Sequence, residues 1–469
     1  MPLHLNYQYA AMAAGSLMGI AVGANAGWSS PYLPYLLGED SHIPMTEDEG
    51  FWCAVASLLG APIGSSIASM LIDTTGRRRF ILSLAPISFL SYILIAMATD
   101  VWTLIAARVA IGATEGALYI ALPMYYGEIS DPKIRGFISS SVSVAALLGT
   151  ILINIIGPFV SITTTGFICS VFPFLHMISF WAMPDSPYYL IKKGDLEGAR
   201  HSLVILRGHK DVDTELDEIH MAVTRQENTK DSNASYLDLF TVTSNRRAFI
   251  IYCILCFTNK YSGKSPVTFY TTIIFAQADG ILDPVLSTIT FYIVGMITTL
   301  IGMCVVDKFG RRPMLLFSAV GCSIALAACG AYFALQTFAS GYVQYVTWLP
   351  IVSLITYNMI FSCGLSFGPV LFLSELFPTS VKAKALFLGD TTSVVMATTA
   401  SKFFQVSSDQ LGMYVPFSSF AICTFLGACM IYLYVPETKG KTLEQIQVEL
   451  IGSDVYLKEQ IYTDEKCKA

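Results

Sequence analysis

The chain has 469 residues, of which 54% are hydrophobic and only 13% carry a charged side chain. A soluble protein has about 25% charged residues, and so small a charged fraction could not cover a folded surface in water. The formal net charge of −6 lacks the basic excess expected of a nucleic-acid-binding domain. The cysteines lie mostly inside apolar runs, which argues against a secreted disulfide framework. Most of this chain is therefore expected to lie in a lipid bilayer.

Twelve apolar segments follow one another along the chain. A bilayer core about 30 Å thick is crossed by a helix of about 20 apolar residues, and backbone groups in lipid must be hydrogen-bonded internally. The sequence thus predicts an all-α membrane protein with twelve transmembrane helices in two pseudo-symmetric six-helix bundles. The predicted helices lie at 7–30, 51–72, 80–98, 101–127, 137–160, 164–183, 247–275, 285–306, 313–335, 342–374, 383–407 and 414–435.

A polar stretch, 184–246, separates the two sets of six. Its segments 195–208 and 214–223 have an amphipathic period and predict short helices at the membrane interface. The stretch is too small for an enzyme with its own core, so no catalytic activity is expected. The predicted organisation is an N-terminal bundle at 1–183, a cytoplasmic linker at 184–246, a C-terminal bundle at 247–436 and a cytoplasmic tail at 437–469.

The distribution of basic residues predicts the orientation. With both termini and the linker in the cytoplasm, the segments left outside contain no lysine or arginine. Basic residues concentrate on the cytoplasmic side of membrane proteins, so this orientation is favoured. Four of the 28 basic residues fall inside predicted helices instead: Arg108, Lys260, Lys264 and Lys402.

The two halves repeat the same charged pattern. Asp73–Arg79 follows the second predicted helix, and Asp307–Arg312 follows the eighth. Such an internal duplication is typical of transporters whose halves move about a central site. Ion pairs at the cytoplasmic face are predicted to hold the halves together while the outside is open; the alternative is a solvated anchor without a gating role. In each half a glutamate also closes a helix seven positions before a basic residue: Glu128 with Arg135, and Glu375 with Lys382.

A series of short motifs runs along the whole chain: Asp73–Arg78, Arg108–Gly112, Pro123–Ser130 with Arg135 and Gly136, Pro184–Pro187, Leu206–Gly208, Asp307–Arg312, Ser374–Pro378 and Pro436–Gly440. In these motifs and in their order, the chain resembles the sugar porter branch of the major facilitator superfamily, particularly the facilitated trehalose transporters of insects. The resemblance implies a uniporter that moves trehalose or a hexose across the plasma membrane by alternating access. It implies a monomer with a small-molecule substrate, and neither a cofactor nor a metal.

The resemblance also implies a cytoplasmic gate of paired charges. Asp185 stands where the family has a glutamate, which shortens one arm of this network. The implied gate residues are Arg77, Arg78, Glu128, Arg135, Asp185, Arg311, Arg312, Glu375, Lys382 and Glu437.

The sugar contacts of the family are mostly amide and aromatic side chains, which suit hydroxyl groups. This sequence departs from them. The seventh helix has Asn-Lys-Tyr-Ser-Gly-Lys-Ser at 259–265 in place of Gln-Gln-Leu-Ser-Gly-Ile-Asn, and Val370 replaces a tryptophan. Short hydroxyls and aliphatic groups have thus replaced amides and rings. The implied substrate-binding residues are Ser143, Asn259, Lys260, Ser265, Tyr270, Gly368 and Ser393.

Lys260 and Lys264 lie one turn apart in the seventh predicted helix. An unpaired charge there costs several kcal/mol, so each ammonium needs a partner or a wet cavity. Glu115 and Asp390 are candidate partners; the alternatives are contact with an anionic or polar substrate and snorkelling to the interface. Glycines and prolines nearby, with a second group in the tenth helix, predict bending points at Gly263, Pro266, Gly364, Gly368 and Pro369. The alternative is that these residues allow close helix packing.

Two further positions bear on coupling and on packing. Proton-driven relatives have an aspartate in the first helix, whereas Asn25 stands there and cannot titrate, so uncoupled transport is expected; Glu115 is a possible substitute carboxylate. Arg108 is expected to have a structural carboxylate or carbonyl partner. Two other functions stay open: a transporter of another small polar or anionic solute, and a transporter-like nutrient sensor.

Overall fold

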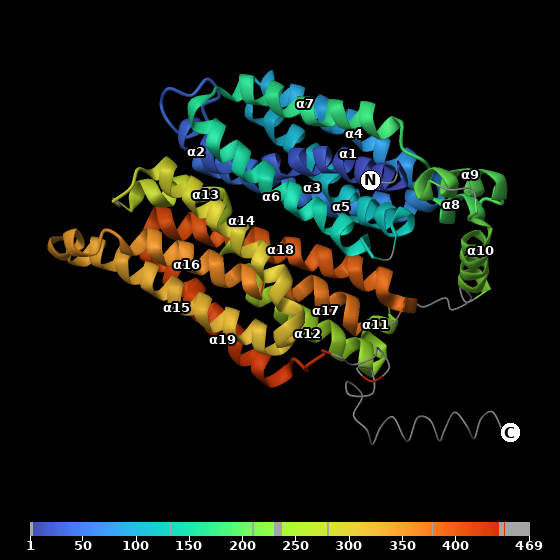
Figure 1. Cartoon of the computed structure of the whole chain (residues 1–469). Coiled ribbons are helices and arrows are strands. Elements are labelled where there is room, and N and C mark those ends of the chain that lie inside the picture. Colours follow the sequence, from blue (N-terminus) through green and yellow to red (C-terminus); the bar gives the residue numbers. More distant parts are fainter. Residues whose placement is uncertain are drawn as a thin grey trace. The chain divides into compact units, whose positions relative to one another are not determined.

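The structure is a computed structural model. It describes residues 3–131, 133–208, 211–228, 237–278, 281–377, 379–439 and 445. Every regular element in these ranges is a helix, as Figure 1 shows. This confirms the all-α prediction for the described part of the chain.

The first half contains long helices that match the predicted segments closely. The turns between them are short, and α3 begins with a capping box in which Thr46 and Glu49 bond each other's backbone N–H groups. The helices are α1 (Leu3–Gly27), α2 (Ser29–Leu36), α3 (Glu47–Thr75), α4 (Arg77–Ala96), α5 (Val101–Ile129), α6 (Arg135–Ile156) and α7 (Ile162–Trp181).

The linker contains the amphipathic helices that the sequence predicts. Segments 195–208 and 214–223 fall on α9 (Leu196–Arg207) and α10 (Asp213–Asn228), with α8 (Pro187–Lys192) before them and α11 (Asp238–Thr241) after them. Helices α8, α9 and α10 share a small apolar core of their own, which includes Ile191, Ala199, Leu203, Val212, Ile219 and Val223.

The second half contains two broken helices at the predicted bending points. Helix α12 ends at Lys260. Gly263, with φ +80°, then lies directly before the start of α13. A second break at Gly364 separates α16 from α17. The helices are α12 (Thr243–Lys260), α13 (Lys264–Gln277), α14 (Pro284–Phe309), α15 (Arg311–Phe338), α16 (Leu349–Cys363), α17 (Gly368–Leu376), α18 (Thr379–Leu411) and α19 (Tyr414–Tyr434).

Ten stretches of the described chain are long and apolar enough to cross a membrane. They comprise α1 with α2, then α3, α4, α5, α6 with η1 (Gly157–Phe159), α7, α14, α15, α16 with α17, and α19. The other two predicted segments, 247–275 and 383–407, fall on α12 with α13 and on α18. The break after Lys260 shortens the first, and Asp390 and Lys402 make the second more polar.

The chain forms two compact units. The first comprises Met1–Asp231 with Pro266–Met296, and the second comprises Ser232–Ser265 with Ile297–Ala469. Residues 266–296 join the first unit through contacts such as that between the hydroxyls of Ser30 and Thr272, 3.0 Å apart. The division at 183, 246 and 436 that the sequence suggests stays a prediction.

In the first unit, α3 and α5 pack backbone against backbone. Glycines recur every four residues on both helices, at Gly60 and Gly64 on α3 and at Gly112 and Gly116 on α5. A Cβ atom on Gly64 would lie 1.7 Å from the carbonyl oxygen of Ala113, and the other three would lie 2.0–2.1 Å from facing carbonyl oxygens. Small residues at this spacing are a common means of close helix packing in membranes.

Candidate functional site

The repeated charged motif forms the same turn in both units. Gly76, between α3 and α4, has φ +91° and ψ 150°; Gly310, between α14 and α15, has φ +92° and ψ 154°. A positive φ of this size favours glycine. In both turns the next residue is an arginine that begins a helix, so Arg77 and Arg311 occupy equivalent positions.

Arg77 is the buried centre of an ion-pair cluster in the first unit. Its Nε lies 3.0 Å from Oε2 of Glu128, and its Nη1 lies 3.1 Å from Oδ1 of Asp73. The Arg77 side chain is only 6% exposed and that of Glu128 is 14% exposed. Ser186 donates to Glu128, and Lys192 bonds Asp73 at 2.8 Å. The cluster therefore ties the ends of α3 and α5 to the linker helix α8.

The second arginine of each turn also has an equivalent place. Arg78 donates to the carbonyl of Trp181 at the end of α7, and Arg312 donates to the carbonyl of Tyr432 in the last turn of α19. The acidic residues that follow these helices differ in reach. Asp185 lies 3.7 Å from Arg78 Nη1, whereas Glu437 accepts the backbone N–H groups of Arg311 and Arg312 at 3.0 and 3.1 Å.

Glu437 thus caps the N-terminus of α15. Partial burial raises the pKa of Glu437. Hydrogen bonds from the backbone of Lys439, Arg311, Arg312 and Thr438 lower it by more, so the net pKa is below the ordinary value. Asp185 has no such role at α4: among the described residues its buried Oδ1 has no hydrogen-bond partner. The aspartate is one methylene shorter, which accounts for the difference.

Exchanging the two carboxylates is expected to exchange these roles. Asp185→Glu should cap α4 and stabilise the protein by about 1 kcal/mol, and Glu437→Asp should cost about as much. Because the pKa of Glu437 is lowered on folding, its stabilisation is complete above about pH 4.3 and is lost as the pH falls through the folded-state pKa. Thermal unfolding of the purified variants between about pH 3 and 7, a range that extends below the ordinary pKa of a glutamate, checks this. An Asp185→Glu protein less stable than the natural one would contradict it.

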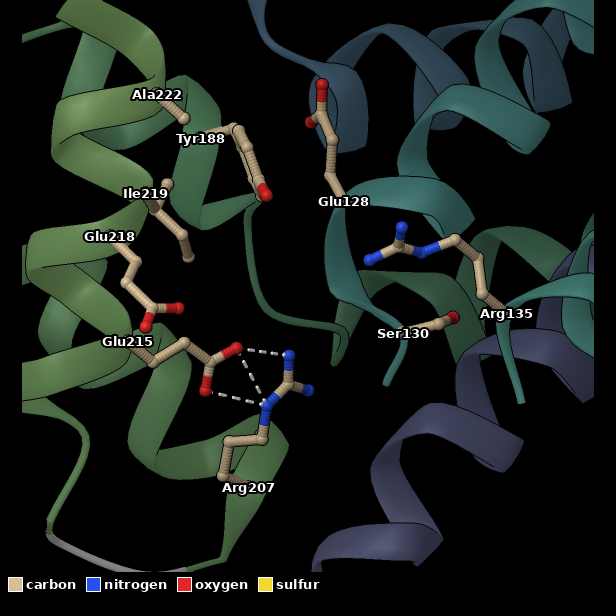
Figure 2. A pocket seen from close by; sticks show the side chains of 9 residues that line it. All are labelled: Glu128, Ser130, Arg135, Tyr188, Arg207, Glu215, Glu218, Ile219 and Ala222. Atoms are coloured by element: carbon tan, nitrogen blue, oxygen red, sulfur yellow. Dashed lines mark hydrogen bonds and ion pairs between the residues drawn. The ribbon is translucent and has the colours of Figure 1, made fainter. Parts of the chain in front are cut away.

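A cavity of about 300 Å³ lies beside the Arg77 cluster. It is lined by the end of α5, the start of α6 and the linker helices. Figure 2 shows Arg135 pointing toward it from α6, and the Arg207–Glu215 pair of α9 and α10 on the opposite side. Arg207 Nη2 lies 2.7 Å from Oε1 of Glu215, and its Nη1 donates to the Ile129 carbonyl at 2.9 Å. Arg135 forms no ion pair within 4.0 Å in the described part of the chain. The Leu206–Gly208 motif drew attention to Arg207 in the sequence. The sequence did not predict that Glu215 of α10 is the ionic partner of Arg207.

Two of the predicted gate residues, Glu375 and Lys382, have side chains outside the described part of the chain. The other eight lie at the positions given above, Arg77, Arg78, Glu128, Arg135 and Asp185 in the first unit and Arg311, Arg312 and Glu437 in the second.

The predicted substrate-binding residues fall in both units. Ser143, exposed on α6, and Tyr270, buried where the helical backbone of α13 is interrupted, belong to the first. The second contains Asn259, Lys260, Ser265, Gly368 and Ser393.

The polar groups of the second unit gather at its two helix breaks. Asn259 Nδ2 donates to the Leu365 carbonyl at 2.7 Å, which links the end of α12 to the α16–α17 break. Lys264 Nζ donates to Oδ1 of Asn358 at 3.0 Å and lies 5.2 Å from the centre of the Phe361 ring. These contacts hold both breaks together within the unit.

Lys260 is in a different situation from Lys264. Among the described residues, its ammonium makes neither a hydrogen bond nor an ion pair. Asp390 on α18 and Cys256, one turn earlier on α12, act on it electrostatically, and Ser393 bonds Cys256. Asp390 therefore interacts with Lys260 electrostatically, but the two side chains do not form the predicted direct ion pair.

The fold is that of a known class of membrane transporters. The structure superposes on the inward-open xylose transporter XylE of E. coli with a TM-score of 0.77 and 20% sequence identity, over 94% of this chain and 99% of that chain. It also superposes on XylE, a proton:xylose symporter of the major facilitator superfamily, bound to 6-bromo-6-deoxy-D-glucose, with a TM-score of 0.71 and 21% identity, over 95% and 100% of the two chains.

A family model described as "Sugar (and other) transporter" matches residues 40–450. The chain belongs to this family, which confirms the resemblance predicted from its motifs. It is 29% identical to "Trehalose transporter 1" of Drosophila melanogaster over 96% of this chain, but spans only about half (52%) of that relative. It is also 29% identical to "Facilitated trehalose transporter Tret1" of Culex quinquefasciatus, over 93% of this chain and 84% of the relative. These relatives are transporters, a non-enzymatic class.

Proposed function

We propose that this protein is a secondary transporter that moves trehalose or a hexose down its concentration gradient by alternating access. The observation that carries the proposal is the family match over 40–450, together with relatives named as trehalose transporters. The proposal includes twelve transmembrane helices, with α12–α13 and α18 added to the ten apolar stretches. It places the protein in the plasma membrane as a monomer, with both termini in the cytoplasm.

The charged clusters at Gly76 and Gly310 are proposed as the cytoplasmic gate. The equivalent backbone of the two turns supports this, because a duplicated element suits two halves that open and close against each other. Glu375 and Lys382, which follow the same spacing as Glu128 and Arg135, are proposed to complete it in the second half.

The seven predicted substrate positions are proposed to surround the sugar. Amide and hydroxyl groups both donate and accept hydrogen bonds and so match sugar hydroxyls. Asn259 and Ser393 supply such groups. The helix breaks at Gly263 and Gly364 support alternating access, because discontinuous helices are typical of binding sites in secondary transporters.

Lys260 favours a second candidate function, transport of a small organic anion. Its ammonium has no direct partner among the described residues, and a half-buried cation within the membrane region is stabilised by a carboxylate on a ligand. Under this alternative, Lys260 binds the acid group and the hydroxyl-bearing side chains bind the rest of the solute.

Uptake into oocytes that express the full chain separates the two candidates. Labelled trehalose, glucose and succinate are compared in the natural protein, in Lys260→Met, and in Lys402→Met as a control, because Lys402 already bonds Gln405 at 2.7 Å. The sugar proposal predicts trehalose or glucose uptake that Lys260→Met lowers less than about tenfold. Succinate uptake that only Lys260→Met lowers by more than about tenfold would favour the anion; sugar binding without uptake would favour a sensor.

A further inference from the structure

Arg108 lies completely buried in the first unit, two turns after the start of α5. Its Nε donates to the carbonyl of Cys53 on α3 at 2.8 Å, and its Nη2 donates to the hydroxyl of Ser29 at 3.0 Å, where α2 begins. Its guanidinium lies 4.8 Å from the centre of the Trp28 ring. These contacts confirm the carbonyl partner expected from the sequence, and all of the bonding partners are uncharged.

Among the described residues, none supplies a counter-charge next to the guanidinium of Arg108. No carboxylate of the described residues lies within 4.0 Å of its guanidinium. Glu115 acts on it electrostatically but follows seven residues later on α5, about 10 Å along the helix axis. A buried charge without a nearby counter-charge is strongly unfavourable in a low-dielectric interior.

Several buried hydrogen-bond donors beside Arg108 also lack acceptors. Within the described structure, Arg108 Nη1, Trp28 Nε1 and Asn25 Nδ2 have no hydrogen-bond partner, although Arg108 and Asn25 are 0% exposed and Trp28 is 1% exposed. Asn25 lies in the last turn of α1, and Trp28 follows the end of α1 in a helical conformation three residues later, so the two side chains share a face. The Tyr92 phenol interacts with the backbone of Asn25, and Arg108 acts on it electrostatically. Buried polar groups are almost always satisfied, so this cluster calls for an acceptor.

The chemistry of the cluster selects the kind of acceptor. Three N–H groups on a site with one positive charge match a small monovalent anion, which accepts several hydrogen bonds and neutralises the charge. A water molecule could accept some of these bonds and donate one to Asn25 Oδ1, but it would leave the charge unbalanced. We propose that Arg108, Trp28 and Asn25 form an internal binding site for a halide ion, chloride under ordinary conditions.

The bound anion has a structural consequence for the first unit. Arg108 joins α5 to α3 through Cys53 and to the α1–α2 junction through Ser29. An anion that balances its charge therefore stabilises the packing of three helices. The effect does not depend on the identity of the transported solute, so it can be tested separately from the proposed transport.

Thermal unfolding of the purified full chain in detergent tests the site. Sodium chloride is exchanged for sodium gluconate at constant ionic strength, and the melting temperature is followed by intrinsic fluorescence. The natural protein is expected to gain about 3 °C at saturating chloride, with a hyperbolic dependence on its concentration. Bromide should act like chloride, and gluconate should have no effect.

Two variants outside the guanidinium itself keep the test decisive. Asn25→Asp places a fixed carboxylate beside Arg108, so this variant should be as stable in gluconate as in chloride. Trp28→Phe keeps the ring but removes one N–H donor, and should raise the half-saturating chloride concentration about fivefold. Trp102→Phe, at a position 72% exposed on the same helix as Arg108, is the matched control and should behave like the natural protein.

The proposal is overturned by any of three results. The first is a melting temperature of the natural protein that is the same in chloride and gluconate at every concentration, as expected if water alone fills the cluster. The second is an Asn25→Asp variant that keeps the full chloride response. The third is a Trp28→Phe variant with an unchanged half-saturating concentration.

Discussion

Replacing Arg77 with methionine is expected to lower the free energy of unfolding by about 3–5 kcal/mol. The substitution removes the cation that pairs with Glu128 and leaves that carboxylate, only 14% exposed, without its ionic partner. Lys192 still pairs with Asp73, so the loss falls mainly on Glu128. Unfolding of the purified protein by increasing SDS, followed by fluorescence, measures the change.

The double variant Arg77→Met with Glu128→Leu gives the control for this prediction. Removing both charges leaves no buried ion without a partner, so the double variant should be clearly more stable than Arg77→Met alone. Arg200→Met, which breaks the exposed Arg200–Asp213 pair, should leave stability almost unchanged because exposed pairs contribute little. A double variant less stable than the single one would show that the buried pair is not the source of the effect.

Replacing Gly64 with valine is expected to prevent correct folding of the first unit. Its Cβ atom would lie 1.7 Å from the Ala113 carbonyl oxygen, and neither of the two backbones can move away without separating α3 from α5. The expected loss is at least about 4 kcal/mol, within the range of severe core substitutions. The yield of monodisperse protein on size-exclusion chromatography measures it.

Helix α5, which packs against α3, provides the matched control. Gly127 has no atom within 4 Å of an added Cβ atom, so Gly127→Val should give a nearly normal yield, apart from the lower helix propensity of valine than of alanine. Equal yields for Gly64→Val and Gly127→Val would contradict the close packing of α3 on α5.

The sequence predicted most of the helices because their apolar length is a local property. The segments of α3, α4, α5, α7 and α19 follow directly from it, and the amphipathic period located α9 and α10. Apolarity was a poorer guide where polar groups interrupt a helix, as at Lys260 between α12 and α13. The glycine spacing of α3 and α5 was present in the sequence, but only the facing carbonyls of the folded chain show what it does.

The charged site was predictable as a set of residues but not as a set of pairs. The duplicated motif identified Arg77 and Arg311, because their spacing recurs in both halves, and the resemblance to the family implied Glu437. The sequence did not indicate that Glu437 binds backbone N–H groups, nor that Asn358 accepts from Lys264 in place of the two carboxylates considered. Such pairings join residues about a hundred positions apart, and their choice depends on where helices lie in space.

The most direct test of the central claim is sugar flux in proteoliposomes that contain only this purified protein. The account predicts saturable entry of labelled trehalose or glucose until the inner concentration equals the outer one, at the same final level with or without a pH gradient, because Asn25 cannot carry a proton. Accumulation above the outer concentration when the outside is acidic would contradict uncoupled transport. Entry of neither sugar faster than into protein-free vesicles would contradict sugar transport itself.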